Sequence, residues 1–232
     1  EEGRLRNSRG SGRNMCAALQ HEFTIEPGEE VRFIVLVGVV YHKEDAVSLR
    51  QRYDAWGEAE RGLVEVHRYW DGYMGRTTAA TPSREFDLTF NIWNKYQAWI
   101  TSRWSRMDSY YVGGGSIIGF RDSWQDMLAI LPNDPDWARE RVIYMLEHQF
   151  PDGSTLHNWD PLTNIGVKTG HSDDPMWLVL GVLEYIKESG DIVFLDEAVR
   201  YYDSGSEAVR QHMLRAIDYT LAHMSERGIP LI

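Results

Sequence analysis

The sequence contains a single cysteine, Cys16, among its 232 residues. One cysteine cannot form an intrachain disulfide, and no CxxC cluster offers the ligands of a structural zinc site. The chain therefore lacks the disulfide framework that is typical of small secreted domains. We expect a cytoplasmic protein without a bound metal or other cofactor.

Positive charge and long apolar runs are also scarce. The 24 lysines and arginines stand against 35 aspartates and glutamates, a net charge of −11, which excludes the basic surface that nucleic acid or an anionic membrane requires. The longest mostly apolar run, residues 31–41, is broken by Arg32 and has about half the length that spanning a bilayer takes. We expect neither nucleic acid nor a membrane as a partner.

Aromatic side chains, in contrast, are abundant, with nine tryptophans, twelve tyrosines and seven phenylalanines. Aromatic rings bury large areas in protein cores, and they also stack on the apolar faces of sugars. The length corresponds to roughly one and a half domains of typical size. Composition alone therefore excludes partners and gives only a hint of sugar recognition.

The N-terminal part has the pattern of β-strands. Apolar and polar side chains alternate over residues 19–25, a turn sequence follows at 26–30, and residues 31–40 form a nearly continuous β-branched run. This pattern predicts a hairpin whose second strand is buried on both faces. A lone hairpin is not stable in water, so it requires further strands that the sequence does not contain.

The remaining chain has the pattern of helices. Apolar residues recur at steps of three or four over residues 44–73, which predicts a helical linker that ends at a small-residue break, 77–82. Beyond it, one helical stripe is predicted, formed by Trp93, Tyr96, Ile100, Trp104 and Met107.

Three cap signals predict further helix starts: Asp134-Pro135, Asp174-Pro175, and the capping box of Ser204 and Glu207. The helix after Asp174 is apolar on almost every side, so it should be surrounded by protein, and it should end at Gly190.

One unusual stretch places three glycines, residues 113–115, ahead of Arg121, Asp122, Gln125 and Asp126. Glycines let the backbone pass close to a ligand, and the polar residues fall at the expected start of a helix. The alternative is structural, with Asp122 as a helix cap and Arg121 as its ion-pair partner. No GK[ST] follows the glycines, so the stretch does not fit a phosphate loop.

A second stretch, residues 153–161, is a polar loop that contains His157, which no apolar period explains. A plain turn is the alternative. A third has two adjacent carboxylates, Asp173 and Asp174, where one suffices as a cap. With Asp174 as the cap, Asp173 is left against an apolar helix. Burial and the neighbouring carboxylate raise a carboxyl pKa, whereas a helix N-terminus lowers it. If the first two prevail, Asp173 can act as a general acid.

A metal site built from His171, Asp173 and Asp174 would lack a second histidine at ligand spacing.

Four motifs, in this order, resemble those of glycoside hydrolase family 94, the cellobiose and chitobiose phosphorylases. They are residues 91–97, residues 119–126, Gln149 with 152–153 and His157, and residues 172–178. The resemblance covers nearly the whole chain and implies a mainly α fold. Residues 1–43 would be the C-terminal end of a β-sandwich domain, 44–82 a helical linker, and 83–232 the N-terminal half of an (α/α)6 barrel that continues beyond this segment.

The resemblance also implies a reaction, the inverting phosphorolysis of a β-linked disaccharide or short oligosaccharide, cellobiose- or chitobiose-like, to an α-sugar 1-phosphate. Inorganic phosphate is the co-substrate, and the full-length protein is expected to be a homodimer. By resemblance Asp173 is the general acid. The implied substrate-binding residues are Arg121, Asp122, Gln125, Asp126, His157 and His171, of which Gln125 and Asp126 are expected to support the turn.

Two departures from the family concern the sugar. The family tends to have an arginine where this chain has Ser116, and an aromatic residue where it has His171. The substrate is therefore left open, and the phosphate-binding groups are expected outside this segment, which alone should be inactive. The alternatives are an inverting hydrolase on the same barrel, which needs a second carboxylate, and a catalytically silent sugar-binding or scaffold segment.

Overall fold

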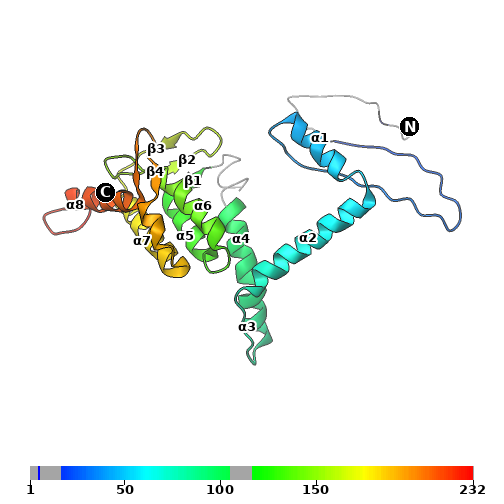
Figure 1. Ribbon diagram of the computed structural model, residues 1–232, viewed down its shortest axis with the longest axis horizontal. Helices are drawn as coiled ribbons and strands as arrows, with labels where there is room; N and C mark the ends of the chain where they lie inside the picture. The colour runs from blue at the N-terminus through cyan, green and yellow to red at the C-terminus, as the bar shows by residue number, and fades with distance from the viewer. Residues whose placement is uncertain (1–4, 6–16, 105–116, 232) are drawn as a thin grey trace. The chain divides into compact units, whose positions relative to one another are not determined.

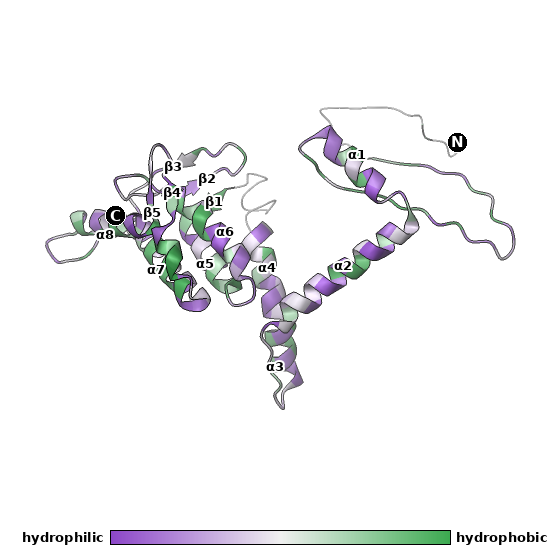
Figure 2. Cartoon of the chain, viewed as in Figure 1, coloured by the Kyte–Doolittle hydropathy of each residue, from purple (hydrophilic) through white to green (hydrophobic). Residues whose placement is uncertain are grey.

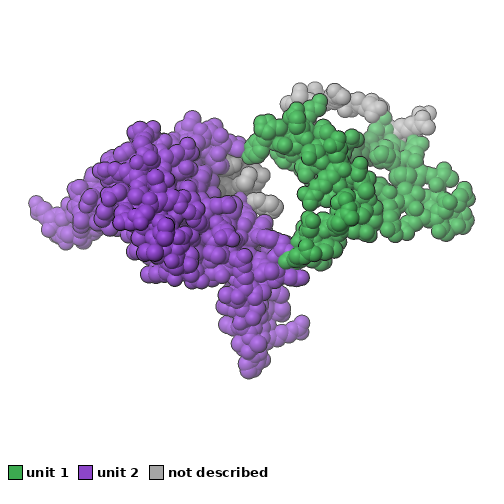
Figure 3. All heavy atoms as spheres, in the orientation of Figure 1, with its two compact units in different colours: residues 1–68 green, residues 69–232 purple. Residues whose placement is uncertain are grey.

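A computed structural model describes residues 5, 17–104 and 117–231. Cys16, Met107, the glycines at 113–115 and Ser116 lie outside the described residues. The chain folds into two compact units, Glu1–Arg68 and Tyr69–Ile232 (Figure 3). Their boundary falls within helix α2, and the predicted boundaries after residues 43 and 82 stay predictions.

The first unit contains α1 (Lys43–Arg52) and the beginning of α2 (Trp56–Gly75). The predicted turn forms, since the amide of Glu29 donates to the carbonyl of Glu26 at 3.0 Å and Gly28 has φ 88°. The prediction of a hairpin with a buried second strand is wrong, however. Residues 17–41 form no strand, and Val37 and Val39 are 94% and 100% exposed. The physical reason is that two apolar strands without neighbours have nothing to pack against.

The second unit is mainly helical (Figure 1). Its helices are α3 (Arg84–Leu88), a π-helical turn (Thr89–Trp93), α4 (Asn94–Trp104), α5 (Phe120–Ile130), α6 (Pro135–Leu146), α7 (Asp174–Ser189), a 3-10 turn (Ile192–Asp196) and α8 (Val209–Ala222). Its strands are β1 (Ile118–Gly119), β2 (Asn158–Trp159), β3 (Gly166–Val167), β4 (Ala198–Arg200) and β5 (Ser206–Ala208). β1, β2 and β3 form one antiparallel sheet in that order, and β4 pairs with β5.

The core of this unit lies where α5, α6 and α7 contact one another, with α4 against α5 and α8 against α7. Phe120 and Trp124 of α5 are fully buried among Leu178 and Val182 of α7. Gly181 allows the two helices to approach closely, because a Cβ at this position would overlap the indole ring of Trp124. Glycine is therefore required here by space rather than by backbone conformation.

Helix α7 ends at Gly190, as predicted, with φ 73° in the left-handed region. Figure 2 shows its strongly apolar character. The expectation that α7 is surrounded is wrong for the described residues, because Leu180 and Leu183 are 41% and 42% exposed. The neighbouring helices cover one face of α7, formed by Leu178 and Val182, and leave the opposite face open.

The predicted capping box at Ser204 and Glu207 is also wrong. Glu207 lies in β5 opposite Val199 of β4, and α8 begins only at Val209. The Glu207 carboxylate accepts hydrogen bonds from Tyr201 Oη at 2.8 Å and from Arg215 Nη2 at 2.9 Å. The pairing of β4 with β5 and these two hydrogen bonds therefore determine the conformation of Glu207, and the local cap signal does not.

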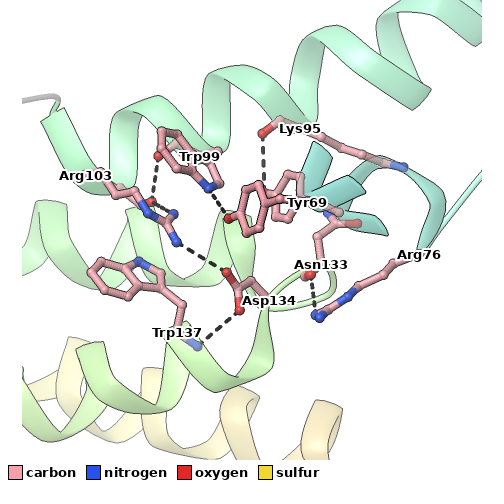
Figure 4. Close-up of polar contacts among 10 residues, drawn as sticks. Tyr69, Arg76, Lys95, Trp99, Arg103, Asn133, Asp134 and Trp137 are labelled. Carbon is pink, nitrogen blue, oxygen red and sulfur yellow. Dashed lines mark hydrogen bonds and ion pairs between the residues drawn. The ribbon is translucent and has the colours of Figure 1, made fainter. Parts of the chain in front are cut away.

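Helices α4 and α6 are joined by a partly buried ion pair (Figure 4). Arg103 Nη2 lies 3.3 Å from Asp134 Oδ2, and each side chain is only 16% exposed. The guanidinium carbon lies 4.3 Å from the ring centroids of both Trp99 and Trp137. Asp134 also caps α6 as predicted, since its Oδ1 accepts from the amide of Trp137 at 3.2 Å.

Candidate active site

The small sheet brings three separate segments of the chain together. β1 leads directly into α5, and the amide of Phe120 donates to the carbonyl of His157 at 2.9 Å. The amide of His157 in turn donates to the carbonyl of Val167 at 2.8 Å, just before the chain continues into α7. The starts of α5 and α7 and the loop before β2 therefore meet at one place, and this place holds most of the predicted site residues.

The predicted residues Arg121 and Asp173 form an ion pair across this site. Arg121 Nη1 lies 2.7 Å from Asp173 Oδ2, and the side chains are 44% and 41% exposed. Asp122 is not the cap residue of α5, because Gly119 occupies that position. Arg121 forms an ion pair with Asp173.

Asp173, rather than Asp174, occupies the cap position of α7, which corrects the prediction. Its backbone carbonyl accepts from the amides of Met176 and Trp177, each at 3.0 Å. Its side chain makes no cap bond, because Oδ2 accepts from Arg121 and, at 3.3 Å, from the indole Nε1 of Trp177. The carboxylate thus faces outward instead of closing the helix.

The pKa of Asp173 is lower than that of an ordinary aspartate. Burial raises this pKa, but the hydrogen bond and charge of Arg121 and the indole of Trp177 together outweigh it. The contact with Arg121 therefore favours the ionised form of Asp173, in the opposite direction to the raised pKa that a general acid needs. Burial does not raise the pKa of Asp173 overall, because an arginine lies against this carboxylate. Sequence spacing could not reveal this contact, since the two residues are 52 positions apart.

Asp174 is the buried member of the pair, only 2% exposed. Its Oδ2 lies 2.8 Å from Nδ1 of His157, and its Oδ1 has no hydrogen-bond partner among the described residues. Burial raises the pKa of Asp174, whereas the hydrogen bond and charge of His157 lower it, and the net shift is upward. The raised carboxyl pKa that was expected for Asp173 belongs to its neighbour.

His157 and His171 are stacked, with ring centroids 3.9 Å apart and planes 7° from parallel. Together with Asp174 they offer two nitrogens and a carboxylate oxygen within 4.8 Å of one another. The second histidine that the sequence-based metal site lacked is therefore His157. However, a metal ion lies in the plane of each imidazole it binds, at about 2.0–2.1 Å from the nitrogen. Two parallel stacked rings cannot both meet this condition, so the three residues as arranged do not fit a metal ion.

The other predicted site residues lie on α5. The Asp122 carboxylate lies against Gly119, where an added Cβ would collide with Oδ2 of Asp122. Gln125 is exposed one turn beyond Arg121. Asp126 is half-buried, and its charge acts on the half-buried Arg141 of α6. The structure therefore brings Asp122 to the end of β1, whereas the charge of Asp126 acts on α6.

Gln149, one of the motif residues, is fully buried and does not reach this site. Its Nε2 donates to the carbonyl of His212 at 3.0 Å, and its Oε1 lies 2.7 Å from Nδ1 of His212. This residue holds α8 against the turn after α6. Its place in the motif thus has a structural explanation.

Two residues at the site were given no part in sugar binding or catalysis by sequence reasoning. Asp174 was treated as a helix cap or as a metal ligand, and Trp177 was treated only as part of a motif. The available signal for Trp177 was its spacing, because a residue four positions after Asp173 lies above it on the same face of a helix. The role of Asp174 depends on His157, a contact that no local pattern contains.

Residues 69–232 match the catalytic domain of the glycosyl hydrolase 94 superfamily, and residues 1–55 match the glycosyl hydrolase 94 supersandwich domain. The chain belongs to this superfamily. The resemblance that the four motifs indicated is thereby confirmed.

Several curated relatives are phosphorylases. The chain is 32% identical to the N,N'-diacetylchitobiose phosphorylase of Vibrio furnissii over 98% of its length and 31% of that protein. It is 29% identical to the enzyme of the same name from Vibrio proteolyticus, over 99% of this chain and 32% of that protein. It is 31% identical to the solabiose phosphorylase of Paenibacillus borealis, over 99% of this chain and 28% of that protein. The chain thus spans about a third of the length of these relatives.

In the part of the chain that the structure describes, no helix combines the length and the apolar character needed to cross a membrane.

Proposed function

We propose that the protein containing this chain catalyses the inverting phosphorolysis of a β-linked disaccharide or short oligosaccharide. The observation that carries the proposal is the outward-facing carboxylate of Asp173 at the start of α7, in a chain that belongs to the glycosyl hydrolase 94 superfamily. Relatives that are phosphorylases of N,N'-diacetylchitobiose and of solabiose support the reaction class, and their different sugars leave the disaccharide open.

In the proposed reaction Asp173 gives its proton to the glycosidic oxygen, and the bond between this oxygen and the anomeric carbon breaks. A phosphate oxygen forms a new bond to the anomeric carbon from the opposite face, which converts the β-glycoside into an α-sugar 1-phosphate. Inverting hydrolysis needs a second carboxylate to activate water. Phosphate is already an anionic nucleophile, so one acid is sufficient.

The remaining site residues have supporting roles in this proposal. Arg121 and Asp122 hold hydroxyl groups of the transferred sugar, and His157 and His171 line its site. His157 is well placed for this role because the buried Asp174 fixes its ring. Gln125 and Asp126 support the turn rather than touch the substrate. Inorganic phosphate is a co-substrate, and no further cofactor is invoked.

The architecture is proposed by the same reasoning. The helices of residues 83–232 would form the first half of an (α/α)6 barrel, and the exposed face of α7 with Leu180 and Leu183 would pack against its remainder. A cytoplasmic homodimer is proposed for the whole protein.

The test is an assay of the full-length protein with N,N'-diacetylchitobiose and cellobiose, with and without phosphate. The expected result is a sugar 1-phosphate that forms only with phosphate and is the α-anomer by NMR. Sugar release that is indifferent to phosphate would indicate the hydrolase, and binding without turnover on either of these or on other β-linked disaccharides would indicate a silent domain.

A further inference from the structure

Asp173 accepts hydrogen bonds from two side chains that lie on different helices. Both Arg121 Nη1, at 2.7 Å, and Trp177 Nε1, at 3.3 Å, contact the same oxygen, Oδ2. Trp177 lies one turn further along α7, so it keeps its place relative to the carboxylate as long as the helix is intact. Arg121 reaches across from α5, and its side chain is 44% exposed. It is therefore the donor that can leave.

The contact with Arg121 conflicts with the proposed role of Asp173. A general acid must carry a proton before it can transfer one to the leaving oxygen. An arginine at hydrogen-bond distance favours the ionised carboxylate, and it lowers the pKa of Asp173 even though burial acts in the opposite direction. The contact therefore disfavours the protonated form of Asp173 that the reaction needs.

The other charged and titratable groups around Asp173 do not remove this conflict. Asp122 on α5 acts on Arg121, and the charge of Asp173 raises the pKa of Asp174 on α7. His157, before β2, and His171, before α7, act on Asp174, and His157 is hydrogen-bonded to it. Among the described residues, Arg121 provides the one arginine or lysine ion pair to Asp173.

The ion pair is also easy to separate. Both partners are more than 40% exposed, and pairs of this kind contribute little to stability because water screens the charges. A planar guanidinium can instead make paired hydrogen bonds to neighbouring hydroxyl groups. A sugar that offers hydroxyl groups to Arg121 can therefore compete with Asp173 for it.

We propose that Arg121 is a positioning residue that keeps Asp173 ionised until the sugar binds, and then turns to the sugar so that Asp173 takes up one proton from water. This inference rests on the proposed phosphorolysis. In the uptake step one O–H bond forms on the carboxylate, and no other bond changes. Trp177 stays on the acid throughout and keeps it oriented. Proton uptake is thus coupled to substrate binding, and the acid is formed only when it is needed.

The test is the pH dependence of two kinetic constants for the full-length protein at saturating phosphate. kcat/KM for the disaccharide reports groups of the free enzyme, and kcat reports groups of the complex. In the wild type, kcat/KM should fall with rising pH over a range in which kcat is still constant. Coinciding midpoints in the wild type would overturn the inference without any variant.

Arg121→Gln should move the midpoint of the kcat/KM profile upward by about half a pH unit, since the opposite charge lowers the carboxyl pKa but water screens part of its effect. The kcat midpoint should not move, because Arg121 has already left Asp173 in the complex. Arg121→Lys, which keeps the charge, should shift the kcat/KM profile less. The matched control is Arg200→Gln, which breaks an arginine–carboxylate contact of similar length, 2.8 Å, to Glu147.

An unchanged kcat/KM midpoint in Arg121→Gln, or an equal shift in both profiles, would contradict the inference. An equal shift would mean that Arg121 remains on Asp173 in the complex. These outcomes differ from failure of the proposed function, which would appear as the absence of phosphate-dependent turnover in the wild type.

Discussion

Nδ1 of His157 lies 2.8 Å from Oδ2 of Asp174, a carboxyl group that is only 2% exposed. This contact ties the loop before β2 to the first turn of α7, the same turn that carries Asp173. Because Asp174 is buried, the position of α7 depends on a polar contact as well as on the apolar core. The orientation of Asp173 therefore depends indirectly on a histidine that does not touch it.

His157→Ala should reduce stability because it leaves the buried Asp174 carboxyl without its described hydrogen-bond partner. The expected loss is about 1–3 kcal/mol, the usual cost of an unsatisfied buried polar group. Urea unfolding followed by tryptophan fluorescence measures it. His67→Ala, which removes an exposed histidine of α2, is the control, and an equal effect of the two substitutions would contradict the structural role of His157.

The raised pKa of Asp174 predicts a pH dependence of stability. The folded chain takes up a proton at this carboxyl at higher pH than the unfolded chain, so acidification through the folded pKa towards the unfolded value favours folding. Asp174→Asn cannot take up this proton. The stability of the wild type relative to Asp174→Asn should therefore increase as the pH falls from neutral into this range, and a decrease would contradict the assignment.

Gly181→Ala should destabilise the packing of α5 against α7, because the new methyl group overlaps the ring of Trp124. The expected loss is about 1–3 kcal/mol, as for other overpacked core sites. Gly72→Ala in α2 is the matched control, since nothing lies within 4 Å of its added Cβ, and alanine is the better helix former by about 1 kcal/mol. Opposite shifts of the urea midpoint are expected, and a stabilising Gly181→Ala would refute the close approach.

Arg103→Lys should weaken the contact between α4 and α6 although it keeps the positive charge. Lysine lacks the planar group that lies between Trp99 and Trp137, 4.3 Å from each ring centroid. The expected loss is about 1–2 kcal/mol from the cation–π contacts of a partly desolvated pair. Arg210→Lys at the more exposed pair with Asp196 is the control and should change the unfolding midpoint little. Equal effects would show that charge alone matters.

Local signals in the sequence were sufficient for much of the helical unit. Asp134 before Pro135 marks the start of α6, and Gly190 marks the end of α7, because caps depend on residues within one turn. The capping box at Glu207 failed because strand pairing with Val199, a non-local contact, determines its conformation. The prediction of an N-terminal hairpin is wrong for a related reason, because a β-strand is stable only when it pairs with neighbouring strands.

The sequence predicted part of the candidate site but not its chemistry. The resemblance placed Arg121, His157, His171 and Asp173 in one group, and these four lie together at the starts of α5 and α7. The exchange of roles between Asp173 and Asp174 could not be predicted, because burial and the partners Arg121 and His157 come from segments that are far apart in the sequence.

The central claim is that Asp173 protonates the leaving group, and a comparison of two substrates in Asp173→Asn tests it most directly. A 4-nitrophenyl β-glycoside has a leaving group that departs as a stable anion, so it needs no acid, whereas a disaccharide does. Asp173→Asn should lose about 10²–10⁴-fold in phosphorolysis of the disaccharide and retain phosphorolysis of the nitrophenyl glycoside, with Asp203→Asn as a control at an exposed aspartate. An equal loss on both substrates, or no loss on the disaccharide, would contradict the account.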